Sequence, residues 1–166
     1  MNLADAYDIE AYPGEYAYLF RTRHEAQYVV RFKPSFYVFE KYPLIAENVF
    51  EFVISLIEKP AGVILPPDER ILPTIAVIAN HFFQQNERVA IYVCDDSDGK
   101  GGARKRKFDG WFWYFNENGF RKHDRPFNES DGYSYFASII FKMSNPLKYD
   151  IIKAFDELAD EYNQPK

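Results

Sequence analysis

The sequence lacks a pair of cysteines for a disulfide, a long apolar run for a membrane span and a grouping of histidines for a catalytic triad. Cys94 is the only cysteine, so an internal disulfide is excluded and a reducing compartment is expected. No apolar stretch approaches about 18 residues, which predicts no transmembrane helix. The N-terminus lacks a basic region followed by an apolar run, so no signal peptide is expected. The three histidines are scattered and outline no catalytic triad. These absences predict a cytoplasmic protein and favour a non-enzymatic role.

Aromatic residues, by contrast, are abundant. They make up 19% of the chain, with 16 phenylalanines and 13 tyrosines, which predicts a core built from packed rings. The length of 166 residues fits one domain spanning residues 1–166. The net charge of −5 argues against general binding to nucleic acid, because that affinity comes from neutralising phosphates. A local basic patch is still compatible with this charge.

Alternating apolar residues predict a β-rich first part. We expect an antiparallel meander of four strands at residues 15–22, 27–33, 36–39 and 48–57, with a tight connection around residues 22–25. The pattern then changes to helical spacing over residues 71–85, where Ile71, Ile75, Ile78 and Phe82 form one stripe. Pro73 is expected in the first turn of this helix, where its missing N–H costs little.

The second part of the chain alternates between strand and helix patterns. A short apolar run at residues 89–94 predicts a buried strand, and residues 103–115 favour a helix over a strand. Alternation over residues 133–143 predicts another strand. Asn145 and Pro146 are expected as N-cap and first residue of a final helix that reaches Tyr162. The order of elements predicts an α+β fold, with helices on one side of the sheet.

The most polar segment, residues 94–107, lies between two apolar ones and is the predicted functional site. Asp95 and Asp98 are candidate ligands for a divalent cation, because carboxylates suit hard metal ions. A calcium-binding EF-hand is excluded, since Lys105 stands where the bidentate glutamate would be required. No other cofactor is predicted. The alternative is a solvated acidic turn whose aspartates bond to nearby backbone.

The same segment could bind an anion. Backbone N–H groups of the glycine-rich residues 99–102 and the side chains of Lys100, Arg104 and Arg106 would contact phosphate oxygens. The spacing of a P-loop is absent, so this is not a Walker motif. A different interpretation pairs these cations with the nearby acids Asp95, Asp96, Asp98 and Asp109, and such exposed pairs would order the loop only modestly.

Aromatic residues follow the cations directly. If residues 103–115 are helical, Trp113 points outward and is the best single candidate for contact with a partner. Cations followed by rings are also found in proteins that bind single-stranded nucleic acid, here through residues 100–107. Cys94, at the end of an apolar run and beside aspartates, is expected to be a buried and inert thiol.

The second half of the chain resembles a family of small uncharacterised bacterial proteins, a domain of unknown function. The resemblance rests on Thr74-Ile75, Phe82-Phe83, Tyr92-Val93-Cys94-Asp95, Asp98, Arg104, Arg106, Phe108 and Trp111-Phe112. It implies a bacterial origin and no established activity, and therefore brings no catalytic residues to this chain.

The leading hypothesis is a non-enzymatic protein that binds another protein through residues 95–106 and neighbouring aromatics. Its contact residues would be Lys100, Arg104, Arg106 and Trp113. The second hypothesis is a phosphate-directed enzyme or nucleotide-binding protein with a divalent cation on Asp95 and Asp98. The third is nucleic-acid binding through residues 100–107. No membrane contact is predicted.

Overall fold

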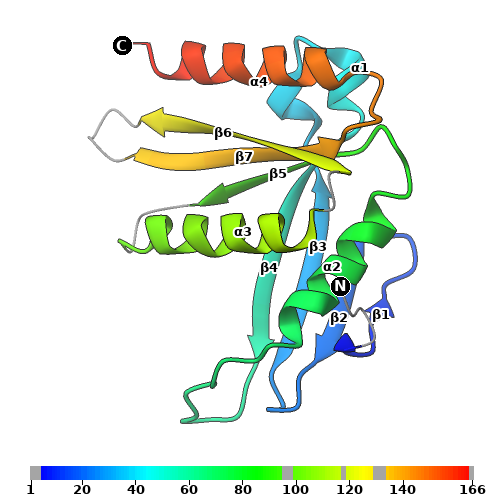
Figure 1. The fold of residues 1–166 in the computed structure, drawn as a ribbon, viewed down its shortest axis with the longest axis vertical. Coiled ribbons are helices and arrows are strands. Elements are labelled where there is room, and N and C mark those ends of the chain that lie inside the picture. The colour runs from blue at the N-terminus through cyan, green and yellow to red at the C-terminus, as the bar shows by residue number, and fades with distance from the viewer. Residues whose placement is uncertain (1–4, 95–98, 117–118, 129–133, 165–166) are drawn as a thin grey trace. The chain divides into compact units, whose positions relative to one another are not determined.

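The computed structural model describes residues 5–94, 99–116, 119–128 and 134–164 (Figure 1). It is an α+β fold with a mixed sheet of seven strands, hydrogen-bonded in the order β1-β2-β3-β4-β5-β7-β6, which confirms the predicted fold class. The chain divides into two compact units, residues 1–33 with 52–85 and residues 34–51 with 86–166. The single domain predicted over the whole chain stays a prediction.

The first unit combines antiparallel strands with one helix. Its elements are β1 (Glu10–Ala11), β2 (Ala17–Arg21), β3 (Gln27–Pro34), the second part of β4 (Val49–Glu58) and α2 (Ile71–Phe82). Strand β2 pairs antiparallel with both β1 and β3. The predicted tight connection between β2 and β3 is confirmed, and Glu25 adopts a left-handed backbone there, with φ of 58°.

The core of the first unit is aromatic, as the composition predicts. Phe82 of α2 is fully buried and stacks on Phe32 of β3 with 3.7 Å between ring centroids. The rings of Tyr16 and Phe82 pack edge to face, with 5.9 Å between their centroids. Pro73 is the third residue of α2, so it lies in the first turn as expected.

The second unit holds the remaining elements. They are the 3-10 helix η2 (Phe36–Phe39), α1 (Pro43–Ala46), the first part of β4, β5 (Val89–Cys94), α3 (Gly101–Phe115), β6 (Phe120–Asn128), β7 (Ser134–Lys142) and α4 (Lys148–Tyr162). Strand β5 runs parallel to β4 and antiparallel to β7, and β7 pairs antiparallel with β6. The predicted strand at residues 89–94 and helix at residues 103–115 are confirmed by β5 and α3.

Helices cover both faces of these strands (Figure 1). On one face, Ile139 and Phe141 of β7 share a buried cluster with α1 and with Phe155 of α4. On the other face, Phe108 of α3 stacks on Tyr92 of β5 with 4.6 Å between ring centroids. In this unit the expected one-sided packing therefore holds for α1 and α4, whereas α3 takes the opposite face. No helix in the described part of the chain has the length and apolarity that a membrane span requires.

Residues 36–39 correct one prediction, since they form η2 rather than a strand. The Val38 N–H donates to the Ser35 carbonyl at 3.0 Å, which closes a helical turn directly after β3. Of the four residues only Phe39 is buried, while Phe36 and Tyr37 are exposed. The sequence pattern was misleading because a run of rings suits a strand and a short helix equally well.

Two further corrections concern the C-terminal half. Strand β6 was not predicted, because it is polar along most of its length and contains Pro126, as is typical of an edge strand. Helix α4 begins at Lys148, two residues later than expected. The Asn145 side chain accepts a hydrogen bond from the Leu147 N–H at 2.9 Å, so it organises the turn that precedes the helix.

Candidate functional site

The predicted cations gather at the start of α3. Lys100 immediately precedes the helix, and Arg104 and Arg106 lie in its first two turns, all three exposed. Asp95 and Asp98, the predicted metal ligands, lie outside the described residues, so a meeting of acids and cations here stays a prediction. Within the described ranges, no group of three or more histidine, cysteine or carboxylate side chains is arranged to hold a metal ion.

The outer face of α3, defined by Arg106, Gly110 and Trp113, is exposed along two helical turns. Trp113 is 73% exposed, which confirms its predicted outward position. Arg106 lies seven residues earlier and therefore on the same side of the helix. Between them, a Cβ added at Gly110 would meet nothing within 4 Å. The Arg106 guanidinium and the Trp113 ring thus lie on either side of a position, Gly110, that has no side chain.

Beneath this face lies a charge cluster made by Lys105, Asp109, Lys122, Asp124 and Ser138. The Lys105 Nζ is 2.6 Å from Asp109 Oδ2 and 3.3 Å from Asp124 Oδ2. The Lys122 Nζ is 2.6 Å from Asp109 Oδ1 and also contacts Asp124. The Ser138 hydroxyl donates to Asp124 at 2.5 Å. Two ammonium groups and two carboxylates thereby connect α3 to β6 and β7.

The electrostatics of the charge cluster favour the ionised forms of Lys105, Asp109 and Asp124. Burial alone would raise the pKa values of Asp109 and Asp124, but the hydrogen bonds and charges of Lys105 and Lys122 outweigh it and lower both. Burial would lower the pKa of Lys105, yet its two carboxylate partners raise it. Because every charge in the cluster has an opposite neighbour, we assign the cluster a structural role, which is to position α3.

The neighbouring groups of β5 are equally unreactive. Cys94 is buried, as expected, and burial raises the pKa of its thiol, with Asp109 adding to the effect. Burial likewise raises the pKa of Tyr92, and the nearby charges of Asp124 and Asp109 add to the effect. A thiol and a phenol that both resist ionisation give this face no obvious nucleophile.

Sequence reasoning found only part of the charge cluster. It predicted that cations of residues 94–107 pair with Asp109, and Lys105 does so one helical turn away. It missed Lys122 and Asp124, because β6 carries no alternating apolar pattern. Ser138 was hidden within the strongly apolar strand β7. The available signal was two opposite charges at alternate positions, 122 and 124, which would share one face of a strand.

Strand β6 is held from its other face as well. The His123 Nε2 is 2.8 Å from Asp156 Oδ1, and the Arg125 Nη1 is 2.6 Å from the same oxygen. Arg125 also contacts Asp160. Burial would raise the pKa of Asp156, but His123 and Arg125 lower it. Alternate side chains of one polar strand therefore pair with α3 on one face and with α4 on the other.

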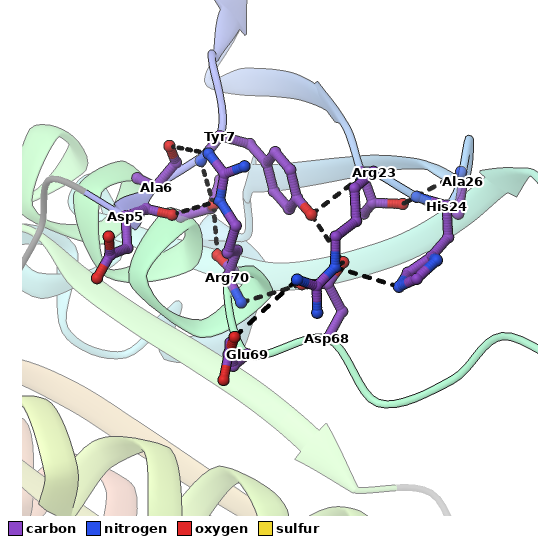
Figure 2. A network of polar contacts seen from close by, with 11 residues as sticks. Asp5, Ala6, Tyr7, Arg23, His24, Ala26, Asp68, Glu69 and Arg70 are labelled. Atoms are coloured by element: carbon purple, nitrogen blue, oxygen red, sulfur yellow. Dashed lines mark hydrogen bonds and ion pairs between the residues drawn. The ribbon is translucent and has the colours of Figure 1, made fainter.

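A separate network in the first unit fixes the segment before β1 (Figure 2). The Tyr7 hydroxyl donates to Asp68 Oδ2 at 2.8 Å and accepts from the Arg23 N–H at 3.0 Å. The Arg70 guanidinium lies 4.0 Å from the centre of the Tyr7 ring, and the Tyr7 N–H donates to Thr74 Oγ1 at 2.9 Å. The Asp68 side chain is only 2% exposed. These groups satisfy one another, so we assign the network a structural role.

Comparison with known proteins identifies the chain's relatives. A family model described as "Family of unknown function (DUF6169)" matches residues 67–157, which is more than half of the chain. The chain belongs to this family. The resemblance to a domain of unknown function noted in the sequence is thereby confirmed. No curated protein and no solved structure matches.

The matched segment of the family of unknown function contains the whole of the candidate site. It begins just before α2 and ends within α4, so it includes β5, α3, β6 and β7. The charge cluster and the outer face of α3 lie entirely inside it. Tyr7 and Arg23, which complete the network around Asp68, lie outside it. The family match therefore coincides with the part of the chain that carries the site.

We expect acid to destabilise the protein through the lowered pKa values of Asp109, Asp124 and Asp156. A carboxyl group whose pKa is lower in the folded state stabilises it above the unfolded value, about 3.9, and loses this contribution as pH falls through the folded value. The free energy of unfolding, measured with urea, should fall steeply below about pH 4. In the variant Asp109→Asn/Asp124→Asn the acid dependence should be shallower, and an unchanged pH dependence would contradict the assignment.

Proposed function

We propose that the protein is a non-enzymatic binding protein that docks an acidic surface of a partner protein on the outer face of α3. The observation that carries this proposal is the position of Trp113, a large ring held in solvent on the side of the helix that carries Arg106. Exposed tryptophan and arginine are the side chains most enriched among residues that dominate binding energy.

The distribution of charge supports an acidic partner. Residues 100–115 carry five cations and one acid in a chain whose net charge is −5. Lys105 is neutralised inside the charge cluster, whereas Arg106 and Lys107 are on the exposed side of α3. The Lys107 Nζ lies 4.9 Å from the centre of the Trp111 ring, so this cation makes a cation–π contact with an aromatic side chain. Opposite charge on a partner would steer its approach and fix its orientation.

This arrangement favours a protein over the two alternatives. Nucleic-acid binding through residues 100–107 would place an acidic chain against a polyanion, and only a few cations are available to neutralise phosphates. A phosphate-directed enzyme requires Asp95 and Asp98 to converge with the cations, and nothing among the described residues favours that arrangement. We also propose a cytoplasmic location, because a single buried cysteine suits a reducing compartment.

The variant Arg106→Ala/Trp113→Ala is expected to lose the partner while it stays folded, because both side chains are exposed and contribute little to stability. The test is affinity capture from a nuclease-treated lysate, with bound proteins quantified for wild type and variant. Nuclease treatment separates a protein partner from one bridged by nucleic acid. Arg121→Ala, which removes an exposed cation of β6, is the matched control and should keep the partner.

The variant Gly110→Ala provides a second version of this test. It should not unfold the protein, so any loss of binding must come from the changed surface. Alanine should stabilise the helix by about 0.5–1 kcal/mol relative to glycine, since the added Cβ has open space around it in the free protein. A partner that closes onto the helix between Arg106 and Trp113 would be pushed away. Equal capture by wild type and by both the double variant and Gly110→Ala would overturn the proposal.

A further inference from the structure

The second unit carries a groove on the face opposite α3. Two adjoining hollows, with volumes of about 160 and 220 Å³, share Lys41 and Tyr42 and lie where η2 and α1 meet α4. We call this the acidic groove. Its principal lining residues are Tyr37, Glu40, Lys41, Tyr42, Leu44 and Glu157.

Side-chain contacts fix the form of this groove. Phe39 of η2 is buried against Phe155 of α4, with 6.5 Å between ring centroids. Beside it, the Lys41 Nζ is 2.6 Å from Glu161, and the Tyr42 hydroxyl donates to Glu157. The wall made by η2 is therefore held against α4 by one buried ring and two polar contacts.

The groove combines negative charge with exposed apolar surface. Among the described residues that line the groove, Lys41 is the one cation, whereas Glu40, Asp150, Glu157 and Glu161 supply four carboxylates. Leu44 is 71% exposed and Tyr37 is 60% exposed, although both line the hollows. Large apolar side chains that stay in solvent beside a hollow are typical of a binding surface.

The groove and the outer face of α3 complement each other. The groove is acidic with an apolar rim, while the outer face presents Arg106, with Lys107 next to it, and the ring of Trp113. The groove lies on the α4 side of the strands, and α3 packs on the other side through Phe108 and Tyr92. One molecule cannot fill its own groove across its own sheet, but a second copy can.

We propose that the outer face of α3 docks in the acidic groove of a second copy of this chain, with Trp113 against the apolar rim and Arg106 toward the carboxylates. This inference rests on the proposed function, because it names the partner of the same surface. Since the two surfaces differ and lie on opposite faces, the contact is head-to-tail. Repetition of such a contact builds rings or open chains.

Sedimentation velocity tests the assembly. The wild-type protein should form species larger than a monomer as its concentration rises. Association should be about tenfold weaker when salt is raised from about 0.05 M to about 0.5 M, because exposed charges are screened. Arg121→Glu, which reverses an exposed charge of β6 at a residue that does not line the groove, should assemble like wild type.

Mixing two defective variants gives the decisive result. Arg106→Glu/Trp113→Ala lacks the outer face, and Glu40→Lys/Leu44→Ala lacks the groove, so each alone should remain monomeric. Mixed together, they keep one intact face and one intact groove, and should form a dimer that grows no further. Circular dichroism checks that both variants are folded. A mixture that stays monomeric, or a variant that assembles alone, would overturn the inference.

The outcome also separates this inference from the proposed function. If the wild-type chain is monomeric at all concentrations while Arg106→Ala/Trp113→Ala still loses a captured protein, α3 binds a different partner and only the second copy is wrong. If the chain is monomeric and capture is unaffected by that variant, the proposed function fails as well.

Discussion

Replacing Phe155 by alanine is expected to lower the free energy of unfolding by about 3–5 kcal/mol, the range for removing a buried aromatic side chain. Phe155 is fully buried and contacts the rings of Phe39, His123 and Phe127. Its loss would leave a cavity among residues of η2, β6 and α4, which do not share one element and cannot close together. The melting temperature should fall by roughly 6–20 °C for a chain of this size.

The control for this prediction is Tyr149→Ala on the same helix. Tyr149 is exposed, so its removal should change stability by less than about 0.5 kcal/mol. Urea unfolding followed by circular dichroism measures both variants. If Phe155→Ala lowered the free energy of unfolding as little as Tyr149→Ala does, the Phe155 ring would not be central to this core. If Phe155→Ala remains folded, it should also lose the acidic groove, because Phe39 of η2 no longer has its partner.

The parts of the fold that were predictable are those in which local pattern and tertiary burial agree. Strand β5 was predicted with its observed ends because its apolar run is buried almost throughout. Helix α2 was predicted from its stripe, in which Ile75, Ile78 and Phe82 are all buried. Trp113 was predicted to be exposed because helical spacing places it opposite Phe108, which packs inward.

The parts that were not predictable depend on contacts between distant segments. Residues 36–39 became a helix because Phe39 alone is buried, against Phe155 more than a hundred residues later. Strand β6 is stabilised by ion pairs on both of its faces, so its sequence shows no apolar alternation. The burial of the Lys122 side chain could not be recognised from sequence, because a lysine side chain is buried only when carboxylates surround it.

Helix α3 unites these observations. Its four cations serve two roles, since Lys105 faces inward to the charge cluster while Arg104, Arg106 and Lys107 are exposed. Among the described side chains of α3, Phe108 packs on Tyr92, and Lys105 and Asp109 make ion pairs with β6. The ion pairs therefore help to hold the helix in position. We expect the rigidity of the proposed binding surface to depend on the charge cluster beneath it.

Replacing Lys122 by alanine should therefore have the largest effect of any charged residue in this part of the molecule. Its side chain is 5% exposed, and its removal leaves Asp109 and Asp124 facing each other with Lys105 as their shared cation. Breaking a buried ion pair by removing one partner costs about 3–5 kcal/mol. We expect the lower end, about 3 kcal/mol, because both carboxylates keep some contact with water.

A double-mutant cycle distinguishes the charge cluster from simple loss of packing. Lys122→Ala and Asp124→Ala should be strongly non-additive, with a coupling free energy of about 0.5–3 kcal/mol, because each leaves the other's charge without its partner. The matched control is Arg121→Ala, the exposed neighbour on β6, which should be almost neutral. Hydrogen exchange should accelerate most in α3, which the cluster holds against β6 and β7. Additive stability changes, or unchanged exchange in α3, would show that this helix is held by its aromatic contacts instead.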